Sequence, residues 1–345
     1  MGDIIKTAVI GTGALGQHHA RIHSELAAES KVEFAGVFDK DHARAESVSS
    51  KLGAKAFSDF DQLLNAADAF SVVTPTITHF DIAKKLLEAG KHVLVEKPMT
   101  QTTGQAGQLV DLAEKHQVAL QVGHVERFNP VYGYLQEAAA RPRFIEAHRL
   151  SPFPARSTDI GVVLDLMIHD IDIILAFVDS PVESVDAVGI PILSESEDIA
   201  NVRLKFKNGC VANITASRVS PERMRKIRVF SSGDTASYVS LDFMKQEGYL
   251  YRLGRAEEKE SSLLKKLLSA KDSAIVSEFA GRKIVREPVP IERAEPLRLE
   301  IESFVDCVNE KRTPLVCGAS AKKALDLALE ITRQIEAAKS HVDEQ

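Results

Sequence analysis

The sequence predicts an α/β protein with two domains, and three observations support this prediction. The first third of the chain alternates short apolar strands with amphipathic helices, which is typical of a doubly wound parallel sheet with helices on both faces. After about residue 123 the strands follow one another instead, which predicts an α+β domain with a mostly antiparallel, open sheet. The length of 345 residues corresponds to roughly two domains of about 150 residues. We expect the domains at residues 1–124 and 125–345.

The N-terminal domain combines β-branched, apolar strands with capped helices. Asp41 and Ser58 suit helix N-caps, and Gly90 suits a helix C-cap. The strands are expected at residues 7–10, 32–38, 69–73, 92–95 and 118–122. The helices are expected at residues 14–28, 41–52, 59–66, 79–89 and 103–116.

The C-terminal domain combines helices with strands of alternating polarity. Asn208-Gly209 lies between two such strands and predicts a hairpin. The strands are expected at residues 184–190, 199–205, 211–218, 226–231 and 236–242. Helices are expected at residues 131–140, 162–178, 295–310 and 319–339, and the charged segment 257–280 is expected to be partly helical.

Composition argues against several classes of protein. Lysine and arginine total 43 against 49 acidic residues, and a net charge of −6 disfavours a nucleic-acid-binding protein. No apolar run approaches the roughly 20 residues that span a bilayer. The three cysteines form no CxxC pattern, so neither a disulfide framework nor a cysteine zinc site is expected. With no secretory signal at the N-terminus, a cytoplasmic location is expected.

The clearest motif is the glycine-rich segment Gly11-Thr12-Gly13-Ala14-Leu15-Gly16. It has the G-x-G-x-x-G spacing, follows a strand and opens a helix, which is the context of a dinucleotide-binding turn. The first glycine permits the turn, the second lets the backbone approach a pyrophosphate, and the third lets helix pack on strand. We expect all six residues to line the cofactor.

Asp39 ends the second strand at the spacing of a ribose-binding acid. Its carboxylate would accept the ribose hydroxyls and repel a 2′-phosphate, which favours NAD over NADP. The neighbouring Lys40 would soften that repulsion. The alternative is that Asp39 caps the next helix.

Lys97 lies in the segment Glu96-Lys97-Pro98, directly after a strand. That position is the carboxyl edge of the sheet, where ligands bind in open α/β folds. Pro98 restricts Lys97 to extended geometry and makes a cis bond accessible. The alternative is a surface lysine beside a turn.

Asp165, His169 and Asp172 are spaced as one stripe along an apolar helix. Buried charge needs a reason, and three remain open: a polar cleft between domains, a buried ion pair or helix-capping network, or a metal triad. The spacing does not require a metal, and we expect none. A histidine with a carboxylate one turn away suits general acid–base chemistry near neutral pH.

These motifs together resemble the glucose–fructose oxidoreductase / inositol dehydrogenase / MocA (Gfo/Idh/MocA) family. The matching segments are GTGALG at 11–16, TPTITH at 74–79, EKP at 96–98, DLMIHDID at 165–172 and Pro314-Leu315-Val316 near the end. The resemblance implies NAD(P)-dependent oxidation or reduction of a sugar or cyclitol carbon. It also implies a Rossmann domain followed by a domain whose open sheet forms oligomers, so we expect a homodimer or homotetramer.

The resemblance also assigns residues to the site. Lys97 corresponds to the lysine of the family's EKP motif, and Asp165 and His169 to its substrate-side pair. The segment that lines the nicotinamide side corresponds to Thr74, Pro75 and His79, and Glu96 is counted with the cofactor residues. Residues 123–130, GHVERFNP, resemble the variant in relatives that oxidise the C3 hydroxyl of UDP-N-acetylglucosamine.

Oxidation of a secondary alcohol needs a base within about 3 Å of the hydroxyl. We assign proton acceptance to His169 and polarisation of the oxygen to Lys97, with the reverse assignment left open. Asp165 would orient the imidazole or bind a neighbouring hydroxyl. Substrate-side candidates are Arg127, Arg156 and Asp172, with Arg149 a further candidate for an anionic group. For each arginine alone, a solvated or structural role is the favoured interpretation.

The function expected from these features is NAD-dependent oxidation of a sugar hydroxyl. A nucleotide sugar such as UDP-N-acetylglucosamine is the first candidate for the substrate, and a free sugar or cyclitol is the second. The alternative from another class is a non-catalytic NAD-binding sensor, which would have no need of Lys97, Asp165 and His169 together.

Overall fold

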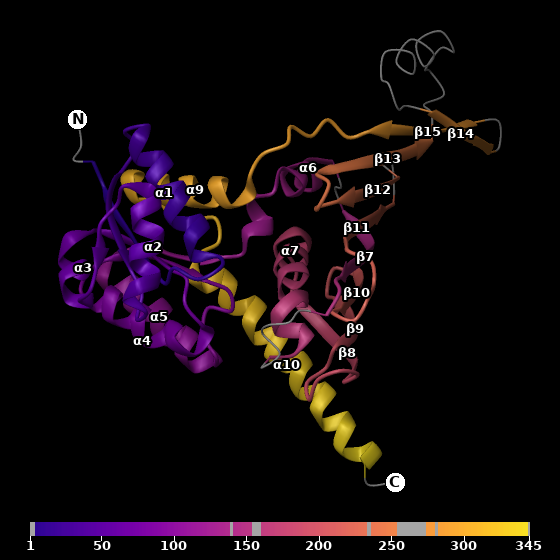
Figure 1. Cartoon of the computed structure of the whole chain (residues 1–345). Helices are drawn as coiled ribbons and strands as arrows, with labels where there is room; N and C mark the ends of the chain where they lie inside the picture. The colour runs from indigo at the N-terminus through magenta and orange to yellow at the C-terminus, as the bar shows by residue number, and fades with distance from the viewer. Residues whose placement is uncertain are drawn as a thin grey trace. The chain divides into compact units, whose positions relative to one another are not determined.

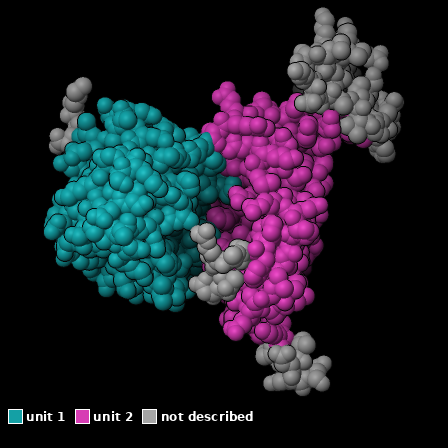
Figure 2. All heavy atoms as spheres, viewed as in Figure 1, with its two compact units in different colours: residues 1–128, 295–326 teal, residues 129–294, 327–345 magenta. Residues whose placement is uncertain are grey.

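The computed structural model describes residues 4–138, 141–153, 160–232, 236–253, 274–279 and 282–343. The chain forms two compact units (Figure 2). Unit 1 holds residues 1–128 and 295–326, and unit 2 holds residues 129–294 and 327–345. From the sequence we expected one boundary, after residue 124. The return of residues 295–326 to the N-terminal unit was not predicted.

Unit 1 is built on a parallel sheet (Figure 1). Its strands are β1 (Lys6–Ile10), β2 (Glu33–Phe38), β3 (Ala56–Phe57), β4 (Ala69–Val72), β5 (His92–Glu96) and β6 (Leu120–Gly123). They run parallel in the order β3-β2-β1-β4-β5-β6. The order reverses between β1 and β4, so the expected doubly wound sheet is confirmed, and loops after these two strands meet where such sheets bind ligands.

Helices alternate with these strands along the chain. They are α1 (Gly16–Ala28), α2 (His42–Leu52), α3 (Phe60–Ala66), α4 (Thr76–Glu88), α5 (Thr103–His116) and the single turn η1 (Val125–Phe128). After the chain has passed through unit 2, α9 (Pro296–Glu310) and the start of α10 (Gly318–Asp343) complete unit 1.

Helix α9 joins unit 1 because its apolar face completes the core there. Phe304 and Ile301 of α9 are fully buried in one cluster with Ile22 and Leu26 of α1 and Leu94 of β5. Burying side chains of this size stabilises a fold by about 1.5–3 kcal/mol each. Apolar packing therefore explains why residues so distant in sequence belong to the N-terminal unit.

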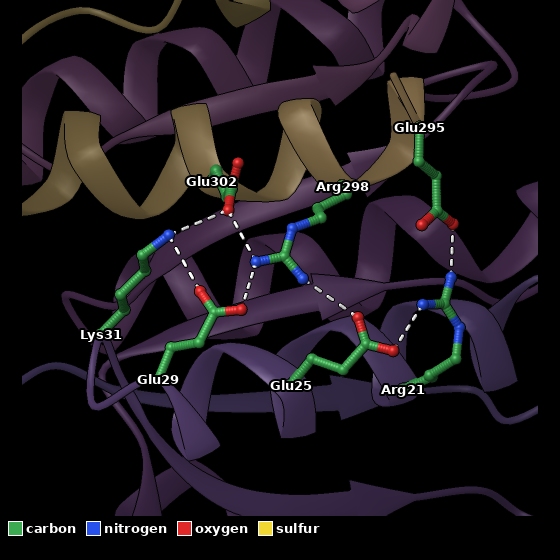
Figure 3. Close-up of polar contacts among 7 residues, drawn as sticks. All are labelled: Arg21, Glu25, Glu29, Lys31, Glu295, Arg298 and Glu302. Carbon is green, nitrogen blue, oxygen red and sulfur yellow. Dashed lines mark hydrogen bonds and ion pairs between the residues drawn. The ribbon is translucent and has the colours of Figure 1, made fainter. Parts of the chain in front are cut away.

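Besides this apolar packing, charged surface residues link α1 to α9 (Figure 3). The Arg298 guanidinium of α9 donates to Glu25 at 3.1 Å and to Glu29 at 2.7 Å. The residues of this network are Arg21, Glu25, Glu29, Lys31, Glu295, Arg298 and Glu302. Exposed ion pairs of this kind contribute little individually, so we attribute the attachment of α9 mainly to its apolar packing.

Unit 2 is built on a nine-stranded sheet (Figure 1). Its strands are β7 (Pro142–Leu150), β8 (Val182–Ile190), β9 (Ile199–Phe206), β10 (Val211–Ser217), β11 (Met224–Ser231), β12 (Ser237–Asp242), β13 (Glu247–Leu253), β14 (Ala274–Phe279) and β15 (Arg282–Pro288). Their order is β14-β15-β13-β12-β11-β7-β10-β9-β8, and only β7 and β10 pair in parallel. The expected mostly antiparallel sheet is confirmed.

Two sequence predictions about unit 2 have different outcomes. The Asn208-Gly209 hairpin is confirmed, because β9 and β10 pair antiparallel and Gly209 has a φ of +82°. Of the segment 257–280, which was expected to be partly helical, residues 274–279 form β14 paired with β15. The rest of that segment lies outside the described residues.

Helices cover one face of the unit 2 sheet. These are α6 (Pro130–Ala138), which contacts β12, and α7 (Ile168–Val178), which contacts β7 and β10. α7 is strongly apolar because most of its side chains are buried. Within the described ranges, no helix is both long and apolar enough to cross a membrane.

Removal of a core side chain from α9 should test how this helix is held. We expect Phe304→Ala to lower the free energy of unfolding by about 3–5 kcal/mol, because the fully buried ring leaves a cavity. Arg298→Ala should cost clearly less, because its partners are exposed. Urea unfolding followed by circular dichroism measures both. Equal losses in the two variants would contradict the packing argument.

Candidate functional site

The glycine-rich turn has the geometry of a nucleotide cradle. Gly11 has a φ of +91°, and a Cβ there would lie 2.3 Å from the Val73 carbonyl oxygen. A Cβ on Gly16 would lie 1.9 Å from the Gly11 carbonyl oxygen, so both glycines are required. Around Gly13, in contrast, the space is open. α1 starts after Leu15 with no side-chain cap, and Ala14 and Leu15 are exposed. The turn therefore offers open space and helix N–H groups to a pyrophosphate.

Asp39 is fixed against this turn. Its Oδ2 accepts hydrogen bonds from the Thr12 amide at 2.8 Å and the Thr12 hydroxyl at 3.0 Å, and its Oδ1 accepts one from the Asp41 amide. Burial raises the pKa of Asp39, but these bonds and the Arg44 guanidinium outweigh it, so the pKa is lowered. The cap of α2 is Asp41, whose side chain accepts from Arg44. The alternative of Asp39 as the helix cap is therefore wrong.

The loop after β4 holds Thr74 and Pro75 at the start of α4. Pro75 is exposed, whereas the His79 imidazole is buried. His79 Nε2 lies 2.8 Å from the Thr74 carbonyl oxygen, and Nδ1 lies 2.9 Å from that of Pro98. Burial, the largest influence, lowers the pKa of His79, while both carbonyls raise it. His79 thus binds two backbone segments.

The segment after β5 carries Glu96, Lys97 and Pro98, with a cis bond between the last two. The buried Glu96 carboxylate lies 3.1 Å from His19 Nε2 on α1, and it accepts the Lys97 amide at 3.3 Å. Burial raises the pKa of Glu96, but the hydrogen bond and charge of His19 and the charge of Lys97 lower it overall. Lys97 itself is half-buried.

The predicted Asp165–His169–Asp172 stripe begins in a wide helical turn. Asp165 lies in the π-turn η2 (Val163–Met167), and His169 and Asp172 follow in α7. A π-turn has more residues per turn than an α-helix, so the regular spacing expected over residues 162–178 is not kept at Asp165. Asp165 and His169 are half-buried, and Asp172 is buried. Across the described ranges, no three metal-ligating side chains are grouped to hold an ion.

The start of η2 is held by Glu197. The Val163 amide donates to Glu197 Oε1 at 3.2 Å, and the Val162 amide donates to its carbonyl oxygen at 2.9 Å. A Cβ on Gly161 would lie 1.9 Å from Glu197 Oε1, so only glycine fits there. Burial raises the pKa of Glu197.

The candidate arginines have separate environments. Arg149 of β7 is buried, and its Nε and Nη2 donate to the Asp170 carboxylate at 2.8 and 3.0 Å. The structural role left open for Arg149 is thus the one observed, and Asp170 accounts for part of the buried charge around the stripe. Arg127 lies buried in η1, which contacts α9. Arg156 lies outside the described residues.

Comparison with known proteins identifies the family. A model described as "Oxidoreductase family, NAD-binding Rossmann fold" matches residues 5–124, and the GFO/IDH/MocA C-terminal domain matches residues 136–238. UDP-N-acetylglucosamine 3-dehydrogenase of Acidithiobacillus ferrooxidans is 35% identical over 96% of this chain and 98% of its own. The chain belongs to the GFO/IDH/MocA oxidoreductase family. NAD as the cofactor and a dehydrogenase activity, both expected from the sequence, are thereby confirmed.

Two further relatives of this GFO/IDH/MocA protein are informative. A solved structure of the Acidithiobacillus ferrooxidans enzyme superposes with a TM-score of 0.86 at 34% identity, covering 97% of this chain and 98% of that one. The scyllo-inositol 2-dehydrogenase (NAD(+)) of Bacillus subtilis is 26% identical over 95% of this chain and 93% of its own.

Unit 1 of this GFO/IDH/MocA protein brings several predicted residues together. The glycine turn and Asp39 share hydrogen bonds, and His79 links the Thr74 and Pro98 segments. Lys97 belongs to unit 1, whereas Asp165, His169 and Asp172 belong to unit 2.

The sequence did not lead us to the residues that support Glu96 and the turn η2. His19 was not singled out, although a histidine three residues after the last glycine, inside an apolar helix face, was a usable signal. Gly123 is required because a Cβ would lie 2.7 Å from Glu96 Oε2. Nothing local in the sequence shows that Glu197 caps η2.

The Asp39 carboxylate should determine which cofactor this GFO/IDH/MocA protein prefers. We expect NADH to bind at least about tenfold more tightly than NADPH, a difference of about 1.4 kcal/mol, because an ionised Asp39 repels a 2′-phosphate. Asp39→Ser should narrow the difference between the two affinities. Asp41→Ser removes a neighbouring charge but keeps a side-chain cap for α2, so it should leave that difference unchanged. Titrations followed by NADH and NADPH fluorescence measure both affinities. Equal or tighter NADPH binding by the unaltered protein would contradict the expectation.

Proposed function

We propose that this protein oxidises a secondary hydroxyl of a UDP-sugar, with the C3 hydroxyl of UDP-N-acetylglucosamine as the first candidate. The observation that carries this proposal is the full-length similarity to UDP-N-acetylglucosamine 3-dehydrogenase, at 35% identity over 96% of this chain. The segment GHVERFNP at residues 123–130 supports the same substrate class.

The cofactor site can be assigned from the chain's own residues. Gly11, Gly13 and Gly16 would hold the pyrophosphate at the start of α1, and Asp39 would accept the ribose hydroxyls. Thr74, Pro75 and Glu96 lie on the loops and strand end at the same edge of the sheet. When bound, NAD⁺ accepts the hydride that leaves the carbinol carbon.

Lys97 and His169 are proposed to handle the hydroxyl oxygen and its proton. The Lys97 ammonium donates a hydrogen bond to the oxygen as negative charge develops on it. His169 accepts the proton and Asp165 orients its ring. A part in substrate binding stays a prediction for Arg127 and Asp172, which are both buried. It stays a prediction also for Arg156, which lies outside the described residues.

A cyclitol or free sugar is the second candidate substrate. The similarity to scyllo-inositol 2-dehydrogenase, at 26% identity over 95% of this chain, favours it. A cyclitol lacks the diphosphate of a UDP-sugar. If the protein oxidises inositols but no UDP-sugar, the cyclitol becomes the preferred substrate class.

The cytoplasm is the proposed location. Cys210, Cys307 and Cys317 are all free thiols, which fits a reducing compartment.

Turnover should depend on both Lys97 and His169. With UDP-N-acetylglucosamine and NAD⁺, we expect Lys97→Ala and His169→Ala each to lower kcat by about 10²–10⁴, the usual loss for a positioned acid–base group. The dissociation constant of NADH should change little. The double variant should lose less than the product of the two losses, because both residues serve one proton transfer.

The control for charge removal is Lys115→Ala, an exposed lysine on α5, which should keep full turnover. If loss of Lys97 instead of His169 removes the acidic limb of the pH profile of kcat, the two roles are reversed. Full turnover in both single variants would contradict the assignment.

We also propose that the protein is a homodimer or homotetramer that pairs through the sheet face opposite α6 and α7. Four apolar side chains near the β8 edge are more than half exposed: Val188, Ile190, Ile192 and Leu193. On the strands further in, Phe144, Phe230, Tyr238 and Tyr251 stack in a half-exposed row. Apolar surface of this extent is typical of an interface.

Light scattering should give the mass of a dimer or tetramer at micromolar concentration. Val188→Glu combined with Ile190→Glu should shift the mass toward the monomer, because both charges would be buried in the interface. Leu315→Glu, at an exposed position of unit 1, is the matched control and should not. A monomer for the unaltered protein would contradict the proposal.

A further inference from the structure

Lys97 is flanked by two neighbours that are each held by a buried histidine. Glu96 before it is bound through its carboxylate by His19, and Pro98 after it is bound through its carbonyl by His79. Both histidines are almost fully buried. We call His19 and His79 the histidine bracket.

His19 holds the residue before Lys97. Its Nε2 lies 3.1 Å from Glu96 Oε1, and within the described part of the chain its Nδ1 has no hydrogen-bond partner. Because the ionised Glu96 carboxylate can only accept, Nε2 is the nitrogen that donates to it. On the other side, Gly123 leaves space for the carboxylate, since a Cβ there would lie within 2.7–2.8 Å of three of its atoms. The carboxylate is therefore confined to one position.

His79 holds the residue after Lys97. Its two ring nitrogens lie at hydrogen-bond distance from carbonyl oxygens, which can only accept. The imidazolium form donates to both oxygens, and the neutral form donates to one. The ring thus connects the loop after β4 with the loop after β5.

Each histidine of the bracket stands on a helix that begins at a nucleotide-facing loop. His19 is on α1, which starts at the last glycine of the glycine turn, and His79 is on α4, which starts directly after Thr74-Pro75. The backbone of Lys97 is therefore tied to both loops through single hydrogen-bonded side chains.

We propose that His19 and His79 are positioning residues that fix Lys97 relative to the two loops that hold the cofactor. This inference rests on the proposed role of Lys97 in turnover. A displacement of about 1 Å in a reacting group can lower a rate by about 100-fold, so loosening either tie should lower kcat more than it weakens cofactor binding.

His23 provides a matched control on the same helix. Like His19 it is buried on α1, but its Nε2 lies 3.0 Å from the Ser71 hydroxyl instead of the Lys97 segment. Burial lowers the pKa of His23 to about 3, so it is neutral. His23→Leu should disturb the packing of α1 as much as His19→Leu does, without touching the bracket.

The first experiment measures kcat, KM and NADH affinity with UDP-N-acetylglucosamine for bracket variants. We expect His19→Leu and His79→Leu to lower kcat by about 10- to 100-fold with a small change in NADH affinity. His19→Gln, whose amide reaches as far as Nε2, should recover most of kcat. His79→Asn, which keeps a donor toward Pro98, should recover more than His79→Gln, which keeps one toward Thr74. His23→Leu should keep kcat.

The second experiment repeats both leucine substitutions in a Lys97→Ala background. If the bracket acts through Lys97, neither substitution should lower kcat further there. Undiminished losses in that background would overturn the inference and leave the role of Lys97 intact. Full activity of Lys97→Ala alone would instead overturn the proposed function.

The third measurement needs no turnover. Competitive acetylation by acetic anhydride, quantified by mass spectrometry against the exposed Lys115, reports the environment of the Lys97 amine. The relative reactivity of Lys97 should change at least about threefold in His19→Leu and His79→Leu, because its charged neighbour and backbone move. It should not change in His23→Leu. Unchanged reactivity in both bracket variants, which remain folded by circular dichroism, would overturn the inference even if UDP-N-acetylglucosamine is not the substrate.

Discussion

The ionised carboxylate of Glu96, buried where β5 ends, is the constraint on which the carboxyl edge of the parallel sheet depends. A buried carboxylate is tolerated only when it is paired and hydrogen-bonded, since its desolvation alone costs several kcal/mol. His19 and the Lys97 segment supply the partners, and Gly123 supplies the space. A single acidic side chain thus determines the residue types needed on α1 and at the end of β6, far away in sequence. It also keeps a negative charge beside the Lys97 ammonium.

Two histidines one turn apart on α1 show how strongly local surroundings determine chemistry. Both are buried, yet His19 faces the carboxylate of Glu96 and His23 faces only a hydroxyl. Burial without a charged partner lowers the pKa of His23 to about 3, so that ring serves packing and stacks on Phe34 at 5.8 Å. Sequence spacing alone cannot separate these roles, because both residues occupy the same face of the same helix.

The parts of the site that could be predicted from sequence are those determined by local geometry. Gly16 packs against the Gly11 carbonyl within one strand–turn–helix unit, and Gly11 turns there with a φ of +91°. Asp39 follows at the spacing of the motif's acidic residue and bonds directly to the turn. Long-range pairings could not be read in this way. Arg149 looked like a possible anion ligand, and only the fold places it on Asp170, 21 residues on. The return of α9 to unit 1 depends likewise on an apolar cluster that assembles only in three dimensions.

The π-turn at Asp165 shows how contacts from outside a helix can change the geometry that its sequence predicts. A regular α-helix over residues 162–178 would keep Asp165, His169 and Asp172 in one stripe, but Asp165 lies in the wide turn η2, where the regular spacing is not kept. Such a turn costs helix stability, and here Glu197 and the missing side chain of Gly161 support it at its first residues. Glu197 lies just before β9 and supports the turn from outside the helix. Tertiary contacts therefore help to determine the helical geometry at Asp165. The spacing in the sequence therefore does not by itself determine how Asp165 stands relative to His169 and Asp172.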